Sequence, residues 1–311
     1  MNNRILLSFY LLAISIQLVN SQDGFASVGE GTTGGAGGNT VDVCTEDELT
    51  TAIIDDTPRI VRVVCNITLE HRLFVGSNKS ILGRTAGAGI AFQGLRIHSK
   101  KNVIIRGLQF CCAFDPSDGV TVENSTNVWI DHNEFYSDMD HHEDYYDGLV
   151  DVIMGSDFVT ISWNQFRNHW KTSLVGSSDS RGDVDIGRLH VTYHHNYFQN
   201  CNSRMPSLRF GTGHIYNNFY ENIVEYAINS RMGAQVLVEG NVFRNATLAI
   251  TTSLYSIEEG YAVERNNDFG GSNNNITQVG TFTNPPYSYR IDRTSKIPYL
   301  VRQHSGQTIL F

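Results

Sequence analysis

Short runs of β-branched and aromatic residues, interrupted by turn residues, make up most of the chain after residue 58. Apolar and polar positions alternate within these runs, which is the period of a strand and not that of a helix. One earlier segment differs. Thr45 is a good N-cap and Glu48 occupies the matching capping-box position, so we predict a helix over residues 45–54. The glycine-rich residues 24–38 are expected to form an irregular entry arm.

A sequence motif recurs along the predicted strands: two or three β-forming residues, a short spacer, and then Asn-x-Phe or Asn-x-Tyr. Its asparagines are separated by 31, 32, 22 and 23 residues, and periods of this size are typical of solenoids and propellers. A degenerate copy over residues 105–110 precedes the full ones. The full copies place their asparagines at Asn133, Asn164, Asn196, Asn218 and Asn241.

The shortest spacing decides between these two architectures. A propeller blade needs four strands and about 40 residues, whereas 22 residues suffice only for one turn of three short strands. We therefore predict an all-β fold, a parallel β-helix whose turns stack on one another. The asparagines would form a hydrogen-bonded ladder and the aromatic residues a stack in the core. The longer spacings predict excursion loops over residues 138–147 and 177–188, where chemistry is expected.

The first residues of the chain predict export. Arg4 supplies a positive charge, residues 5–19 are mostly apolar but short for a membrane span, and Val19 and Ser21 suit a signal-peptidase site. We predict a signal peptide over residues 1–21 and a single secreted, monomeric domain over residues 22–311, with a membrane anchor as the alternative. The formal net charge of −9 argues against general nucleic-acid binding.

Export makes glycans and disulfides expected. Of the five cysteines, Cys44 and Cys65 flank one apparent unit and are the expected pair. Cys111 and Cys112 are adjacent, and adjacent side chains of a strand point to opposite faces, so we expect one of them to pair with Cys201 instead. Glycosylation sequons begin at Asn66, Asn78, Asn124, Asn245 and Asn275.

Charged residues gather on successive predicted turns. Six carboxylates lie between Asp138 and Asp151, and hard oxygen ligands of this kind suit calcium. Because equivalent positions of stacked turns are about 4.8 Å apart, residues from consecutive turns would form one groove, acidic at one end and basic at the other. The alternatives are a solvated acidic loop and a row of surface ion pairs. The residues concerned are Asp118, Asp147, Asp151, Lys171, Arg204 and Arg209.

Four segments around these residues carry a family resemblance. They are Val128-Trp-Ile-Asp-His132, Asp147-Gly-Leu-Val-Asp151, the run from His169 to Ser178, and the run from Asn202 to Asn218. They resemble the pectate lyases of polysaccharide lyase family 1, most closely the fungal-type secreted branch. The resemblance implies a right-handed parallel β-helix that cleaves polygalacturonate by calcium-dependent β-elimination.

The resemblance also implies roles for the charged residues. Lys171 and Arg209 correspond to substrate-binding residues, and Arg204 to the catalytic base. The calcium-binding carboxylates correspond to Asp118, Asp147 and Asp151. The chain departs from the pattern at Pro116, where some members carry a further calcium carboxylate, so either Asp115 substitutes or the site binds calcium more weakly.

These residue types suit the chemistry. Elimination removes the C5 proton beside the C6 carboxylate and expels the O4 glycosidic oxygen, and cations must neutralise the charge that develops. Arginine ordinarily titrates above pH 12, so an arginine base predicts an alkaline optimum.

Three other functions stay open from the sequence. A pectin lyase would act on methyl-esterified chains without calcium. A galacturonan hydrolase would use a pair of carboxylates and would leave Lys171 and Arg204 unexplained. A non-catalytic pectin-binding β-helix would not need these basic residues intact.

Overall fold

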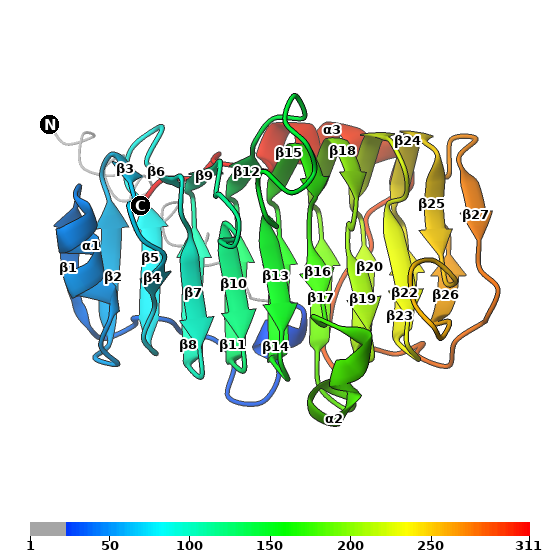
Figure 1. Ribbon diagram of the computed structural model, residues 1–311, viewed down its shortest axis with the longest axis horizontal. Coiled ribbons are helices and arrows are strands. Elements are labelled where there is room, and N and C mark those ends of the chain that lie inside the picture. The colour runs from blue at the N-terminus through cyan, green and yellow to red at the C-terminus, as the bar shows by residue number, and fades with distance from the viewer. Residues whose placement is uncertain (1–22) are drawn as a thin grey trace, which may run out of the picture.

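The computed structural model describes residues 23–311, so the predicted signal peptide and its cleavage site lie outside the described residues. The chain forms a right-handed parallel β-helix (Figure 1), and each full turn contributes one strand to each of three sheets. Strands of consecutive turns pair in parallel, for example Val120–Glu123 with Val150–Ile153. The predicted fold class is confirmed.

The three sheets are named here in the order in which the chain visits them. Sheet A has ten strands: β1 (Asn39–Val43), β2 (Arg59–Val63), β5 (Lys79–Gly83), β8 (Lys101–Arg106), β11 (Thr126–Asp131), β14 (Asp157–Ser162), β17 (His190–His194), β20 (Thr212–Tyr216), β23 (Gln235–Glu239) and β26 (Tyr261–Arg265). Sheet B has eight: β3 (Asn66–Thr68), β6 (Gly89–Ala91), β9 (Gln109–Cys111), β12 (Glu134–Tyr136), β15 (Gln165–Lys171), β18 (Tyr197–Ser203), β21 (Phe219–Ile223) and β24 (Val242–Ala246). Sheet C has nine: β4 (Leu73–Phe74), β7 (Leu95–His98), β10 (Val120–Glu123), β13 (Val150–Ile153), β16 (Leu174–Val175), β19 (Ser207–Arg209), β22 (Ile228–Arg231), β25 (Leu248–Thr251) and β27 (Asn273–Asn275).

The predicted asparagine ladder lies at the turn from sheet A to sheet B. The side-chain oxygen of Asn133 accepts from the backbone N–H of Leu108. On each later turn as far as Asn267, the side-chain oxygen accepts from the backbone N–H of the ladder asparagine one turn before it. Asn267 was not predicted as a ladder residue but belongs to the ladder, and Asn267-Asp-Phe269 repeats the motif. The ladder satisfies buried polar groups that would otherwise destabilise the turns.

The core is filled by side chains that alternate inward along the strands. One aromatic ring per turn stacks on the next, with ring centroids 4.6 to 5.6 Å apart. The stack consists of Phe110, Phe135, Phe166, Phe198, Tyr220, Phe243 and Phe269. Aromatic residues two positions after the ladder asparagines therefore have the role that the repeat predicted.

Helices cover the ends and edges of the solenoid. Helix α1 (Glu46–Ile53) begins at Thr45 with the predicted capping box and packs at the first turns. The short helices are η1 (Phe25–Ser27), η2 (Asp179–Arg181), α2 (Gly182–Asp185) and η3 (Thr294–Lys296). In the described part of the chain, no helix has both the length and the apolar character that a membrane span requires.

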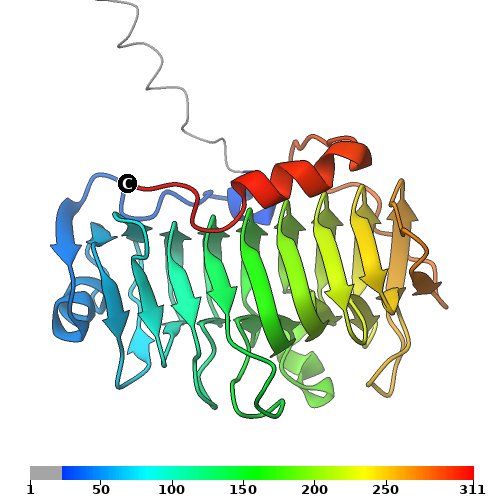
Figure 2. The ribbon, with the colours of Figure 1, turned by 90° about the horizontal axis from the view of Figure 1, so that it is seen from above.

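The C-terminal arm runs back along the outside of the solenoid (Figure 2), and Phe311 donates a backbone hydrogen bond to Gly83. Its helix α3 (Ile297–His304) packs on Tyr197, Phe219 and Val242, an apolar cluster outside the central core. The arm therefore covers a flank of the solenoid.

Two disulfides are present among the described residues. Cys44 pairs with Cys65, as predicted. The expectation for the other cysteines is wrong, because Cys111 bonds to Cys112 and Cys201 keeps a buried free thiol. The two side chains do not point to opposite faces, as they would within a strand, because β9 ends at Cys111 and Cys112 has a left-handed backbone with φ of 64°.

Candidate active site

Five of the six predicted site residues lie at one corner of the solenoid, where the chain passes from sheet B to sheet C, and the sixth, Arg209, lies at the far end of the short strand that follows this corner. We call this line of turns the B–C corner. Asp118 and Asp147 stand just before β10 and β13, and Asp151 lies within β13. Lys171 is the last residue of β15, and Arg204 follows β18 directly. Arg209 ends β19, so four consecutive turns carry the set, as the repeat spacing implied.

The acidic end contains two buried carboxylates on neighbouring turns. Asp118 accepts hydrogen bonds from Thr121 Oγ1 at 2.6 Å and from the backbone N–H of Gly148 at 3.0 Å. Asp151 accepts one from the backbone N–H of Leu174 at 2.9 Å. Burial, with the charge of Asp147, raises the pKa of Asp118 to about 6. Burial, with the charge of Asp118, raises the pKa of Asp151 well above its usual range.

This arrangement fits an added cation. The space between the two carboxylates exists because residue 148 is glycine: a Cβ there would lie 2.6 Å from Asp151 Oδ1 and 2.9 Å from Asp118 Oδ1. Two buried like charges repel unless a counter-ion neutralises them, and an all-oxygen donor set is the one calcium prefers.

The third predicted calcium ligand, Asp147, is directed toward Lys171. Asp147 Oδ1 lies 3.4 Å from Lys171 Nζ, and among residues 23–311 no three metal-ligating side chains come close enough together to hold an ion. Asp115, the candidate replacement for the carboxylate lost at Pro116, is exposed. The protein side chains therefore supply an incomplete site that Asp147 would complete only by leaving Lys171.

Lys171 stands at the middle of the corner. Its Nζ donates to Asp144 Oδ1 at 2.9 Å, and the side chain is only 13% exposed. Burial opposes the charge, but the hydrogen bond that Lys171 donates to Asp144 and the charge of Asp147 raise the pKa of Lys171 above its usual value. The ammonium group is thus fully charged where an anionic ligand would pass.

Arg204 is the free cation of the site. It has a left-handed backbone with φ of 65°, and its guanidinium forms no hydrogen bond or ion pair with any described residue. The side chain is half-buried, and its charge favours the ionised forms of Asp144 and Asp151. An unpaired, partly buried guanidinium beside buried carboxylates is available to a bound ligand.

Arg209 is held in place by Asp179, which is not among the predicted site residues. Its Nε donates to Asp179 Oδ1 at 2.5 Å and its Nη1 to the carbonyl of Gly176 at 2.9 Å. Asp179 belongs to the predicted excursion loop after β16. The prediction gave the position of this loop but not its contact with Arg209.

Arg231 also belongs to this charged region, although it was not predicted from the sequence. Arg231 is paired in register with Arg209 on the next turn, and its Nη1 donates to the carbonyl of Tyr255. Burial, with the charges of Arg209 and Arg204, lowers the pKa of Arg231 to about 10. The basic end of the corner therefore extends one turn further than predicted, and the signal was available as an arginine 22 residues after Arg209.

Comparison with known proteins gives one consistent result. A family model described as pectate lyase matches residues 4–306. Pectate lyase A of Emericella nidulans is 50% identical over 294 residues, which are 94% of this chain and 88% of that protein. Pectate lyase A of Aspergillus niger is 46% identical, covering 93% and 88%. A pectate lyase from Bacillus sp. N165, solved in complex with trigalacturonate, superposes with a TM-score of 0.82 at 35% identity and covers 92% of this chain and 98% of that one.

Proposed function

The chain belongs to the pectate lyase family, whose members are polysaccharide lyases, and from that premise we propose that it cleaves polygalacturonate by calcium-dependent β-elimination. The substrate is (1→4)-α-D-galacturonan, the de-esterified form of pectin, and the products are 4,5-unsaturated oligogalacturonides. The single observation that carries the proposal is the B–C corner, which puts buried carboxylates, a charged lysine and an unpaired arginine on four consecutive turns.

The acidic end would hold the metal. Asp118 and Asp151 would bind Ca²⁺ together with Asp147 once the uronate carboxylate draws Lys171 away from it. Bound calcium would neutralise the substrate carboxylate and so make the neighbouring C5 proton more acidic. Lys171 and Arg209 would bind the carboxylate oxygens and fix the sugar ring in the corner.

Arg204 would act as the base. Its guanidinium is unpaired within the described chain, so it is free to approach C5 and accept that proton. The C4–O4 bond then breaks, the electron pair of the C5–H bond forms the C4=C5 double bond, and the departing O4 takes up a proton. Because the base must first lose a proton, the rate should rise toward alkaline pH.

Ultraviolet absorbance during incubation with polygalacturonate tests the proposal. We expect an absorbance rise with calcium, no rise with a chelator, and no rise from the variant Arg204→Ala despite an unchanged melting temperature. Reducing ends without absorbance would identify a hydrolase, and turnover of methyl-esterified pectin without calcium would identify a pectin lyase. Binding with no turnover on either substrate would leave a pectin-binding protein.

We also propose that the protein is secreted as a monomeric glycoprotein without nucleic-acid or membrane partners. The sequon asparagines Asn66, Asn124, Asn245 and Asn275 are exposed. Asn78 is the only one of the five that is partly buried. Asn78 is therefore the sequon least suited to carry a glycan, which mass spectrometry of the secreted protein would check.

A further inference from the structure

We propose that a patch of aromatic side chains at the acidic end of the B–C corner is an additional sugar subsite, which takes a galacturonate residue whose carboxyl group is methyl-esterified. We call it the aromatic patch, and it consists of Phe92, Phe114, His141 and Tyr145. The inference rests on the proposed function, because it assigns a specificity to the same substrate-binding corner.

The patch continues the line of the site residues. Phe92 follows β6 and Phe114 follows β9, so both stand at the B–C corner, on the turns at and before that of Asp118. Tyr145 precedes Asp147 by two residues in the next turn. A polysaccharide chain lying along the corner would pass over these rings as it leaves the aspartates.

The rings form an ordered, partly exposed surface. Phe92 and Phe114 stack with centroids 5.6 Å apart and planes 6° from parallel. Tyr145 meets Phe114 edge-on at 5.6 Å and stacks on His141 at 4.0 Å. Phe92 is 42% exposed and Tyr145 38% exposed. Large aromatic side chains that are ordered and partly exposed offer a surface on which the apolar side of a pyranose can stack.

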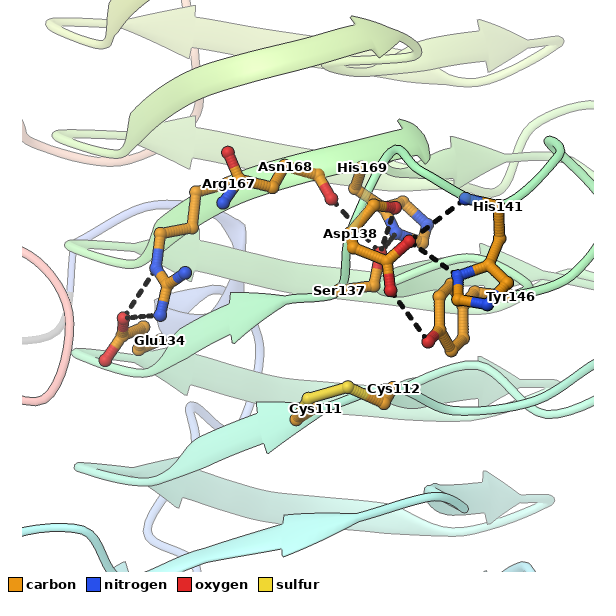
Figure 3. The surroundings of a disulfide bond; sticks show 10 residues. All are labelled: Cys111, Cys112, Glu134, Ser137, Asp138, His141, Tyr146, Arg167, Asn168 and His169. Atoms are coloured by element: carbon orange, nitrogen blue, oxygen red, sulfur yellow. Dashed lines mark hydrogen bonds and ion pairs between the residues drawn. A yellow bond between two sulfur atoms is a disulfide. The ribbon is translucent and has the colours of Figure 1, made fainter.

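The loop that carries His141 and Tyr145 is held by several polar contacts at the surface of the solenoid (Figure 3). Asp138 accepts hydrogen bonds from Tyr146 Oη at 3.0 Å and from the backbone N–H of His141 at 3.1 Å. Trp170 Nε1 donates to the carbonyl of His141 at 2.9 Å. The patch is therefore set in position before a ligand arrives, which reduces the entropic cost of binding.

The other side of the patch is also anchored to the solenoid. The backbone N–H of Phe114 donates to the carbonyl of Phe92, and that of Phe92 to the carbonyl of Cys111. The Cys111–Cys112 disulfide ties the base of this segment (Figure 3). Phe92 and Phe114 consequently stand on a braced turn and not on a free loop.

Charge selects the esterified ligand. Asp140 and Glu143 lie on the same loop, are exposed, and have no ion-pair partner among residues 23–311. Of the cations on the neighbouring turns, Lys171 donates to Asp144, whereas Arg72 donates to the neutral hydroxyl of Ser117 and its charge acts on the buried Asp118. An ionised uronate over the patch would be repelled by Asp140 and Glu143 and would lose hydration. A methyl ester removes the charge and adds an apolar group for the rings to contact.

Equilibrium binding in the Arg204→Ala background separates this inference from catalysis. The ligands are hexagalacturonate and its methyl-esterified counterpart, each with calcium. We expect the double variant Phe92→Ala with Tyr145→Ala to lower affinity for the esterified hexamer roughly fivefold to tenfold, the scale of losing two ring contacts. Its affinity for hexagalacturonate should change less than about twofold.

Two controls keep the test decisive. The pair Phe92→Tyr with Tyr145→Phe preserves both rings and should retain binding. Tyr299→Ala removes an aromatic that is 69% exposed on α3, which packs at the opposite ends of the sheet B strands, and should change nothing. Equal losses for both ligands, or no loss for either, would overturn the inference. Absence of elimination by the unmodified protein would overturn the proposed function alone, since binding is measured without turnover.

Discussion

Removal of one ladder asparagine should destabilise the solenoid far more than removal of an exposed one. Asn196 is fully buried and lies on the turn that leads into β18 and Arg204. Its Oδ1 accepts from the backbone N–H of Asn164 at 2.9 Å, and its Nδ2 donates to the carbonyl of Ile161 at 2.9 Å. The variant Asn196→Ala leaves the backbone N–H of Asn164 buried without a partner and removes one of the hydrogen bonds to the carbonyl of Ile161, which stays paired in the ladder of β14 and β17.

The magnitude follows from one unpartnered group and one lost hydrogen bond. The buried N–H of Asn164 without a partner costs about 1–3 kcal/mol and the lost bond to Ile161 about 0.5–1.5 kcal/mol, so the free energy of unfolding should fall by roughly 1.5–4.5 kcal/mol. The matched control is Asn273→Ala in β27, which removes a single exposed hydrogen bond of 3.3 Å to Thr247 and should cost about 0.5 kcal/mol or less.

Urea denaturation followed by circular dichroism measures the difference. The shift in midpoint, multiplied by a shared slope, gives the change in free energy of unfolding. If Asn196→Ala were no less stable than Asn273→Ala, the ladder would not carry the energetic role that its geometry assigns to it.

Three further predictions concern the site and its pH response. Asp151→Ala should weaken calcium binding at least tenfold to 100-fold, measured by calorimetric titration, and an unchanged affinity would remove this carboxylate from the calcium site. Asp179→Ala leaves Arg209 without its ion-pair partner and should lower kcat/KM on polygalacturonate roughly tenfold or more with the melting temperature nearly unchanged; unaltered kinetics would show that the pair does not position the arginine. Burial lowers the pKa of His195 to about 4, so between pH 6.5 and 4 the unfolded state binds a proton that the folded state does not. Stability should therefore fall as the pH drops through that window, by at most roughly 3 kcal/mol from this residue; a melting temperature that stays constant from pH 7 to 4.5 would contradict the assignment.

The recurring asparagine motif was sufficient to predict the parallel β-helix, its ladder and its aromatic stack. These features are local and periodic, so each turn has the same kinds of residue at the same bend. The shortest period, 22 residues, is too short for a propeller blade. The same periodicity placed Asp118, Asp151, Lys171 and Arg204 on one face, because stacked turns convert sequence spacing into spatial neighbours.

Other features were decided only by the tertiary structure. The bond between Cys111 and Cys112 depends on a left-handed backbone at Cys112, which alternation along a strand does not anticipate. The pairing of Asp179 with Arg209 joins an irregular loop to a strand of the next turn, and no period relates the two. Likewise, Asp147 meets Lys171 because the acidic loop folds back over the corner. Repetition in the sequence thus determines the scaffold, whereas contacts between non-repeating loops and that scaffold depend on packing that only the folded chain defines.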